Sequence, residues 1–240
     1  MRSVRKMLPV YLISLTVLVI CALLASRSVT VLSAFLETPD APRLPVIVLD
    51  PGHGGEDGGA VSSEGIRECE LNLEISLRAR DLLRFLGLPV VMTRESDVSI
   101  HSPEAETVSE KKISDLKNRV RITENAGFAI LVSIHQNMFS ESRYKGAQIF
   151  YASTTGSEAL AEGLQELFDT RLDPSNHRKA KESKTVYLLN RIHCPGILIE
   201  CGFLSNPEEA RSLQTAVYQK KLAASICAGL VQALSDPEAL

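Results

Sequence analysis

Short apolar runs alternate with amphipathic stretches between residues 46 and 234. Apolar runs typical of buried strands occupy residues 46–49, 90–92, 129–134, 147–151, 186–189 and 196–199. Between them, apolar residues spaced three and four positions apart predict helices over residues 68–86, 114–125, 160–168 and 218–234. The polar stretches 96–112 and 173–184 predict surface loops, the first of them mobile. This alternation predicts a single α/β domain, with a twisted, mostly parallel or mixed sheet that carries helices on both faces.

The amino terminus has a different pattern. Arg2, Arg5 and Lys6 precede an apolar run over residues 8–25, which would be about 27 Å long as a helix and so close to the hydrocarbon thickness of a bilayer. The charge order predicts that the amino end stays in the cytoplasm while the rest is exported. A cleaved signal peptide and an uncleaved anchor share these features, but the length of the run and the poor small-x-small sequence at residues 32–34 favour an anchor. We expect a membrane anchor or signal segment over residues 1–27, a linker over 28–44 and the folded domain over 45–236.

Composition narrows the choice of partners. The formal net charge of −3 leaves no basic excess to neutralise phosphates, so nucleic acid is not an expected partner. Trp is absent and aromatic residues make up 5% of the chain, so the sequence shows no platform of stacked rings for a carbohydrate. Five scattered cysteines do not form a disulfide scaffold. Most are expected to be buried thiols, with a bridge between Cys69 and Cys201 left as an alternative.

Candidate chemistry gathers where strands end. The first strand runs into DPGHGG, residues 50–55, which presents His53; the third ends at His135 and the last at Glu200. Because carboxyl ends of strands converge at one edge of an open α/β sheet, these side chains should be neighbours, and Glu68 at the start of the next helix should return to the same edge. Two imidazoles and a carboxylate are typical ligands of the zinc ion in hydrolytic enzymes. A second carboxylate would then be the general base and acid. Spacing alone does not say which glutamate does which, and Glu64 and Glu70 compete with Glu68.

Four ordered motifs carry a resemblance to a known family. They are DPGHGG at 50–55, GIRE at 65–68, SIHQN at 133–137 and ECGFLSN at 200–206. The chain resembles the zinc-dependent N-acetylmuramoyl-L-alanine amidases of the Amidase_3 type, which are bacterial cell-wall hydrolases. The resemblance implies one zinc ion bound by His53, Glu68 and His135, with Glu200 as the catalytic carboxylate. It also implies hydrolysis of the amide between the lactyl group of muramic acid and L-alanine in peptidoglycan.

Three further stretches are similar to the germination-type amidases of the spore cortex: MTRESD at 92–97, RKAK at 178–181 and PGILIE at 195–200. This closer resemblance implies work in spore-cortex maturation, outside the cytoplasmic membrane in the forespore intermembrane space, together with a muramic acid deacetylase that lets the δ-lactam form. The sequence departs from the family at Cys69, where a basic residue is usual. The short connection 139–145 leaves no room for an inhibitory helix, so regulation is expected from expression or from an accessory activator protein.

Other roles stay open. Asn137, Arg94, Arg119 and the basic run 178–181 are candidates for gripping the acidic stem peptide or the glycan, and a structural ion pair or a solvated face is the alternative for each. His101, His177 and His193 match no motif and are interpreted as surface or packing residues. Rival functions are a vegetative cell-wall amidase, a zinc carboxypeptidase acting within the stem peptide, a cysteine hydrolase using Cys69 or Cys201, and a non-catalytic zinc protein that binds peptidoglycan.

Overall fold

The computed structural model describes residues 43–236. The membrane or signal segment predicted over residues 1–27, and nearly all of the linker predicted over 28–44, lie outside this range. Within it, no helix combines the length and the apolar character needed to cross a bilayer.

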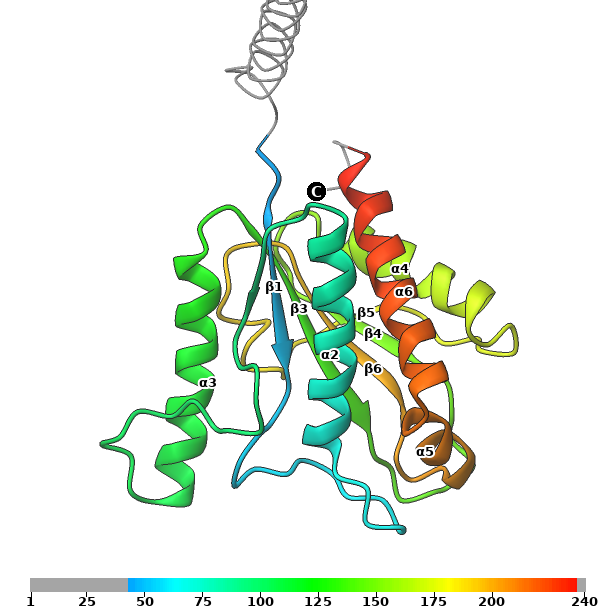
Figure 1. Cartoon of the computed structure of the whole chain (residues 1–240), viewed down its shortest axis with the longest axis horizontal. Helices are drawn as coiled ribbons and strands as arrows, with labels where there is room; N and C mark the ends of the chain where they lie inside the picture. Colours follow the sequence, from blue (N-terminus) through cyan, green and yellow to red (C-terminus); the bar gives the residue numbers. More distant parts are fainter. Residues whose placement is uncertain (1–42, 237–240) are drawn as a thin grey trace, which may run out of the picture. The chain divides into compact units, whose positions relative to one another are not determined.

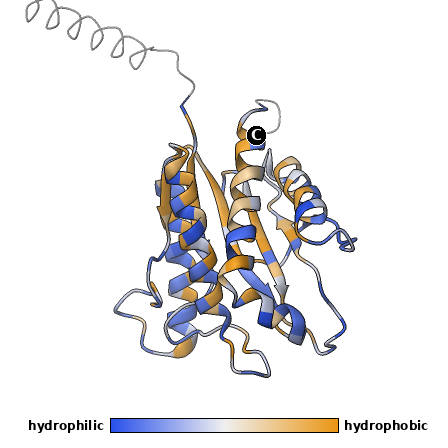
Figure 2. Cartoon of the chain, turned by 45° about the vertical axis from the view of Figure 1, so that its right-hand side comes forward, coloured by the Kyte–Doolittle hydropathy of each residue, from blue (hydrophilic) through white to orange (hydrophobic). Residues whose placement is uncertain are grey.

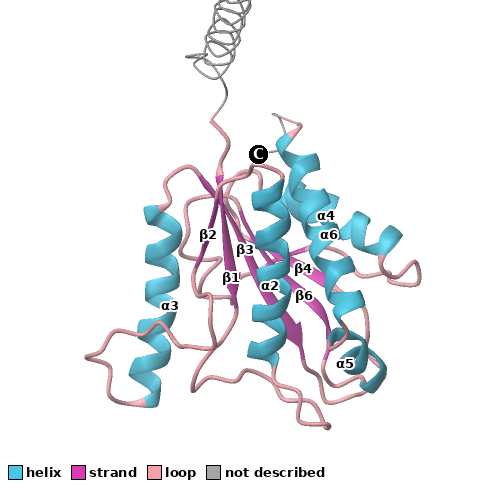
Figure 3. Cartoon of the chain, in the orientation of Figure 1, coloured by secondary structure: helices cyan, strands magenta, loops and turns pink. Residues whose placement is uncertain are grey.

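A six-stranded sheet forms the centre of the domain (Figures 1 and 3). Its strands stand in the order β2-β1-β3-β6-β4-β5. The strands are β1 (Val46–Pro51), β2 (Val90–Met92), β3 (Ala129–Asn137), β4 (Gln148–Tyr151), β5 (Lys181–Glu182) and β6 (Gly196–Phe203). β4 pairs antiparallel with β6, whereas the other four pairings are parallel. The predicted single α/β domain with a mixed sheet is therefore confirmed.

Helices cover both faces of the sheet. The larger apolar cluster joins one sheet face to α2 (Glu68–Phe85), α4 (Ser157–Arg171) and α6 (Ala216–Leu234). The smaller cluster joins the other face to α3 (Val108–Asn125) and to the turns around Leu188 and Ile192. Side chains alternate between these clusters along β1, where Ile47 and Leu49 face the first cluster and Val48 the second. Figure 2 shows the resulting pattern, in which the strands are mainly apolar and the helices carry polar stretches.

Three expectations about elements were wrong, and one helix was not expected. Residues 173–184 are not all loop, because Lys181–Glu182 forms β5, which pairs with β4. Residues 186–189 do not form a strand; they lie mostly in turns, and Leu188 and Leu189 are apolar because the turns bury them against the sheet. Residues 96–112 are not all loop, because α3 begins at Val108, where Thr107 and Glu110 form a capping box. A short helix, α5 (Pro207–Leu213), was not expected although Asn206 caps its start.

Candidate metal centre

The loop after β1 holds His53 in an unusual backbone conformation. His53 has φ 60°, and among the described residues it is the one non-glycine with positive φ. Such a conformation is costly for an L-residue and persists where its surroundings impose it. Here Arg119 donates a hydrogen bond to the His53 carbonyl at 2.7 Å, and Gly54 and Asp57 bridge each other across the turn. These contacts therefore hold the backbone of the loop in the conformation that orients the His53 imidazole.

Three predicted ligands come together at the carboxyl edge of the sheet. His53, Glu68 and His135 each offer one donor atom within 4.8 Å of the others, so the group could hold a metal ion. Glu68 Oε2 lies 3.3 Å from His53 Nε2, and Glu68 Oε1 lies 2.9 Å from His135 Nδ1. Burial alone would raise the pKa of Glu68, but hydrogen bonds from the two histidines hold it far below its usual value. An ionised carboxylate between two imidazoles is a donor set suited to zinc.

The competing glutamates lie elsewhere. Glu64 pairs with Arg211, and Glu70 pairs with Arg67. The geometry thus separates Glu68, inside the ligand group, from its neighbours in sequence.

Glu200 lies beside this group without belonging to it. Its Oε2 is buried and has no hydrogen-bond partner among the described residues. Burial raises the pKa of Glu200 to about 7, although nearby His135 acts against the shift. A buried polar atom left without a partner calls for a further group at that place. A metal ion with its water or substrate beside Glu200 would supply one, so the residues present fit a hydrolytic metal site.

Two supporting residues were missed in the sequence. Asp57 Oδ2 lies 3.0 Å from His53 Nδ1, the ring nitrogen that faces away from Glu68. Asn72 donates hydrogen bonds from its amide to Glu68 Oε1 and to the Gly52 carbonyl. Asn72 lies four residues after Glu68 on α2, and this spacing is a signal that could have found it, since i+4 residues share a helix face. Asp57 lies with His53 in a loop, where the spacing carries no such signal.

Arg94 and Arg119 lie under the loop, with only 3% and 2% of their surface exposed. Arg94 donates to the carbonyls of Pro51, Gly52 and Cys69. Arg119 donates to Asp50, to Asp115 and to the carbonyls of Pro51 and His53. These contacts favour the structural alternative over a grip on substrate.

The remaining candidates are spread around the edge. Asn137 ends β3 and pairs in register with Phe203 of β6. Arg178 donates to the Lys145 carbonyl and lies over the Phe203 ring. His193 pairs with Glu124 at the surface, as interpreted, whereas His101 lines the cavity described below.

The cysteines do not support a thiol-based site. The four cysteines in the described range are free, so the bridge between Cys69 and Cys201 is absent. Both thiols are fully buried, and burial raises the pKa of each. A nucleophilic cysteine needs an accessible thiolate with a lowered pKa.

A cavity of about 490 Å³ opens beside the ligand group. His53, His135 and Glu200 lie in its wall, and the cavity extends to α3 and to the turn at Tyr187 and Leu188. Its volume is in the range of pockets that enclose small ligands.

Comparisons with known proteins identify the family of this chain. Residues 47–232 match a family model described as N-acetylmuramoyl-L-alanine amidase. The chain is 38% identical over 192 residues to the germination-specific N-acetylmuramoyl-L-alanine amidase of Bacillus subtilis (strain 168), across 80% of each protein. The CwlD amidase of Clostridioides difficile, solved in complex with the GerS lipoprotein, is 40% identical with a TM-score of 0.77, over 80% of this chain and 98% of that one. The amidase AmiC2 of Nostoc punctiforme is 27% identical with a TM-score of 0.69, over 80% of this chain and 98% of that one.

Proposed function

Because the chain belongs to the N-acetylmuramoyl-L-alanine amidase family, we propose that it is a zinc enzyme that hydrolyses the amide between the muramic acid lactyl group and L-alanine in peptidoglycan. His53, Glu68 and His135 would hold one zinc ion, and Glu200 would act as general base and acid. The observation that carries this proposal is the donor group of these three residues beside the buried, unpartnered Oε2 of Glu200.

The contacts support these proposed roles. Zinc in a site of two imidazoles and one carboxylate supplies a Lewis acid that polarises a carbonyl and activates water near neutral pH. Glu200 takes the proton of the attacking water as the new carbon–oxygen bond forms. It then delivers that proton to the L-alanine nitrogen as the carbon–nitrogen bond breaks. Asp57 and Arg119 keep the His53 ring and its loop in place throughout.

The biological setting is proposed from the relatives. The Bacillus subtilis relative is named germination-specific, and the Clostridioides difficile amidase was solved with a lipoprotein. We infer that this chain acts on spore-cortex peptidoglycan outside the cytoplasmic membrane, in the forespore intermembrane space, and that an accessory protein assists it. Residues 1–27 would bring the catalytic domain, residues 45–236, to that membrane. Removal of the stem peptide would leave muramic acid ready for a deacetylase and for δ-lactam formation.

Metal analysis combined with muropeptide mapping tests the reaction. The purified protein should contain one zinc per chain and should release whole stem peptides from muramic acid. Release of single amino acids from within the stem would indicate a carboxypeptidase, and bound zinc without any release would indicate a binding protein. Equal rates on vegetative and cortex peptidoglycan would favour a vegetative amidase.

Inhibitors separate the proposal from a cysteine hydrolase. A chelator should abolish activity and added zinc should restore it, because the proposed reaction requires the zinc ion that His53, Glu68 and His135 would hold. A thiol-alkylating reagent should leave activity unchanged, because Cys69 and Cys201 are both buried. Loss of activity on alkylation with the metal retained would contradict the proposal.

A further inference from the structure

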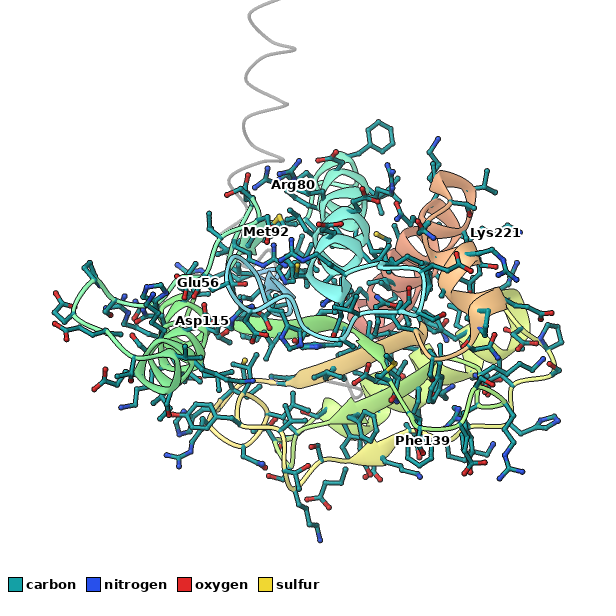
Figure 4. All side chains as sticks on the ribbon, turned by 90° about the horizontal axis from the view of Figure 1, so that it is seen from below. Glu56, Arg80, Met92, Asp115, Phe139 and Lys221 are labelled. Atoms are coloured by element: carbon teal, nitrogen blue, oxygen red, sulfur yellow. The ribbon has the colours of Figure 1, made fainter. Side chains whose placement is uncertain are left out.

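Two surfaces of different character lie near the ligand group. One is the cavity beside α3, which is enclosed on several sides. The other is a ring cluster that we define as Phe139, Tyr144 and Phe203 with Arg143 and Arg178. Figure 4 looks onto this edge of the molecule and shows Glu56 and Asp115, from the cavity wall, on one side and Phe139 on the opposite side.

The cavity combines an apolar wall with ammonium groups, and it also has carboxylates, among them Glu56 and Asp57, that pair with those ammonium groups. Val108, Leu116 and Leu188 line it, together with Lys111 and Lys112 from the first turns of α3. Lys111 is already paired with both oxygens of Glu56, at 2.9 and 3.0 Å. Lys112 is 62% exposed and pairs with Asp57 at 3.8 Å, a longer contact than that between Lys111 and Glu56. Of the two lysines, Lys112 is therefore the less tightly held and the better placed to meet a carboxylate of a ligand.

The ring cluster is assembled by the fold from distant segments. The rings of Phe139 and Tyr144 meet edge to face at 4.9 Å between centroids, and Tyr144 stacks on Phe203 at 6.4 Å. Phe139 is 51% exposed, so one ring is open to solvent. It follows His135 by four residues, which places it within roughly 14 Å of that ligand. A cluster of rings that composition did not reveal is thus present on the same side of the domain as the predicted metal ligands.

The two parts of the substrate, the glycan strand and the stem peptide, differ in shape and charge. Each part therefore suits only one of the two surfaces. A glycan strand continues on both sides of the muramic acid that reacts, so it needs an open surface. A stem peptide is a short branch with free carboxylates, so it can enter an enclosed cavity. Apolar ring faces suit the C–H faces of sugars, and an ammonium group suits a carboxylate.

From these observations we propose that the substrate lies across the metal centre with its stem peptide in the cavity beside α3, facing Lys112, and its glycan strand along Phe139 and Tyr144. This inference rests on the proposed amidase function and adds the direction in which the substrate binds. Lys112 and Phe139 then determine specificity for the two halves of the substrate.

The peptide half is tested with muramyl-L-alanyl-D-glutamate and with the same compound whose carboxylates are amidated. For Lys112→Ala we expect KM to rise about fivefold with the acidic substrate, because one exposed charge contact is lost. KM with the amidated substrate and kcat with both should stay unchanged. Lys117→Ala, which removes an exposed lysine from the same helix, is the matched control and should change nothing. Equal effects of Lys112→Ala on both substrates, or none on either, would overturn the assignment.

The glycan half is tested with substrates that share one stem peptide and differ in glycan length. Phe139→Ala should raise KM about fivefold for the long glycan and leave KM for a single muramyl unit unchanged, since a stacking contact is lost. Phe85→Ala, at a ring that is 87% exposed on α2, is the control and should change neither value. If Phe139→Ala leaves every KM unchanged, the ring cluster binds something other than glycan, such as a protein partner, and the proposal fails.

Different results would contradict the proposed amidase function and the proposed direction of substrate binding. A wild-type protein that loads zinc but releases stem peptide from no substrate would overturn the proposed function and this inference with it. An active wild-type protein whose Lys112 and Phe139 variants show no selective effect would overturn the binding direction alone.

Discussion

Glu200 on β6 lies directly opposite His135 on β3 in the parallel ladder that joins these strands. Residues paired in this way point to the same face of a sheet, so the backbone alone brings a carboxylate next to a proposed metal ligand. The ladder is regular from Leu131 to His135 and becomes irregular just beyond it. A buried, hydrogen-bonded sheet therefore fixes the proposed base more firmly than a loop would.

Replacing Glu200 by Gln should separate catalysis from metal binding. The change keeps the side-chain volume but removes the proton acceptor, so kcat should fall about 10²- to 10⁴-fold. Zinc content should stay at the wild-type value, because Glu200 is outside the ligand group. Muropeptide assays and metal analysis on the same sample measure both. A variant that keeps its activity, or one that loses its metal, would contradict the assigned role.

Asp57→Asn should weaken zinc binding while leaving the ligands in place. Asp57 contacts His53 Nδ1 at 3.0 Å and fixes the ring for coordination through the other nitrogen. Loss of such a supporting carboxylate typically lowers metal affinity about 10- to 100-fold, and a competing chelator measures the change. Glu56→Gln is the matched control because Glu56 is adjacent in sequence but pairs with Lys111. Equal affinities for the wild-type protein and Asp57→Asn would show that the contact is incidental.

Arg119→Met tests whether this arginine supports the fold or grips substrate. Removing one partner of a buried ion pair should lower the free energy of unfolding at pH 7 by about 3–5 kcal/mol, because the Asp50 carboxylate stays buried without its cation. Arg121→Met on the exposed side of the same helix should change it little. Urea unfolding measures the difference. A raised KM with unchanged stability would instead favour substrate binding.

The Asp50–Arg119 ion pair also predicts how the free energy of unfolding depends on pH. Burial would raise the pKa of Asp50, but Arg119 and hydrogen bonds from Thr93 and Ser133 outweigh burial and lower it. Because the folded-state pKa is below the unfolded value, this stabilisation is present above about pH 4 and is lost as the pH falls through the folded-state pKa. The difference in unfolding free energy between wild type and Arg119→Met should therefore shrink on acidification. A difference that is constant between pH 7 and pH 3 would contradict this linkage.

The sequence was sufficient for the elements that carry the site. The strand patterns lead to His53, His135 and Glu200, and the parallel pairing of β1, β3 and β6 brings these residues to one edge. His53 follows β1 in a loop, whereas His135 and Glu200 lie inside β3 and β6, which continue to Asn137 and Phe203. The glutamate at the start of α2 follows from the same rule, but its choice over Glu64 and Glu70 required the family motif or the coordinates. Periodicity fails at residues 186–189, because burial makes a turn as apolar as a strand.

Tertiary contacts account for what the sequence did not reveal. For Arg94 and Arg119 the sequence left open a contact with substrate, a structural ion pair or a solvated face, and only the folded chain shows that loop carbonyls and Asp50 occupy their donors. Phe139, Tyr144 and Phe203 gather only when β3 and β6 pair, so no count of aromatic residues could reveal the cluster. Asp57 and Asn72 act through a neighbour, and their role exists only in three dimensions.

Gly52→Ala should disable the metal centre through packing alone. Gly52 has no positive φ, so alanine is acceptable to the backbone, but a Cβ at this position would overlap the imidazole of His135. The ring has to move from its present position, and misplacement of a site group by about 1 Å can cost about 100-fold in kcat/KM. Zinc affinity should fall as well, because His135 is one of three ligands. Gly163→Ala is the control, since a Cβ there meets no atom within 4 Å and alanine favours a helix by up to about 1 kcal/mol. A chelator competition assay and circular dichroism together decide the outcome: full zinc affinity in a folded Gly52→Ala protein would mean that His135 does not need its present position to bind the ion.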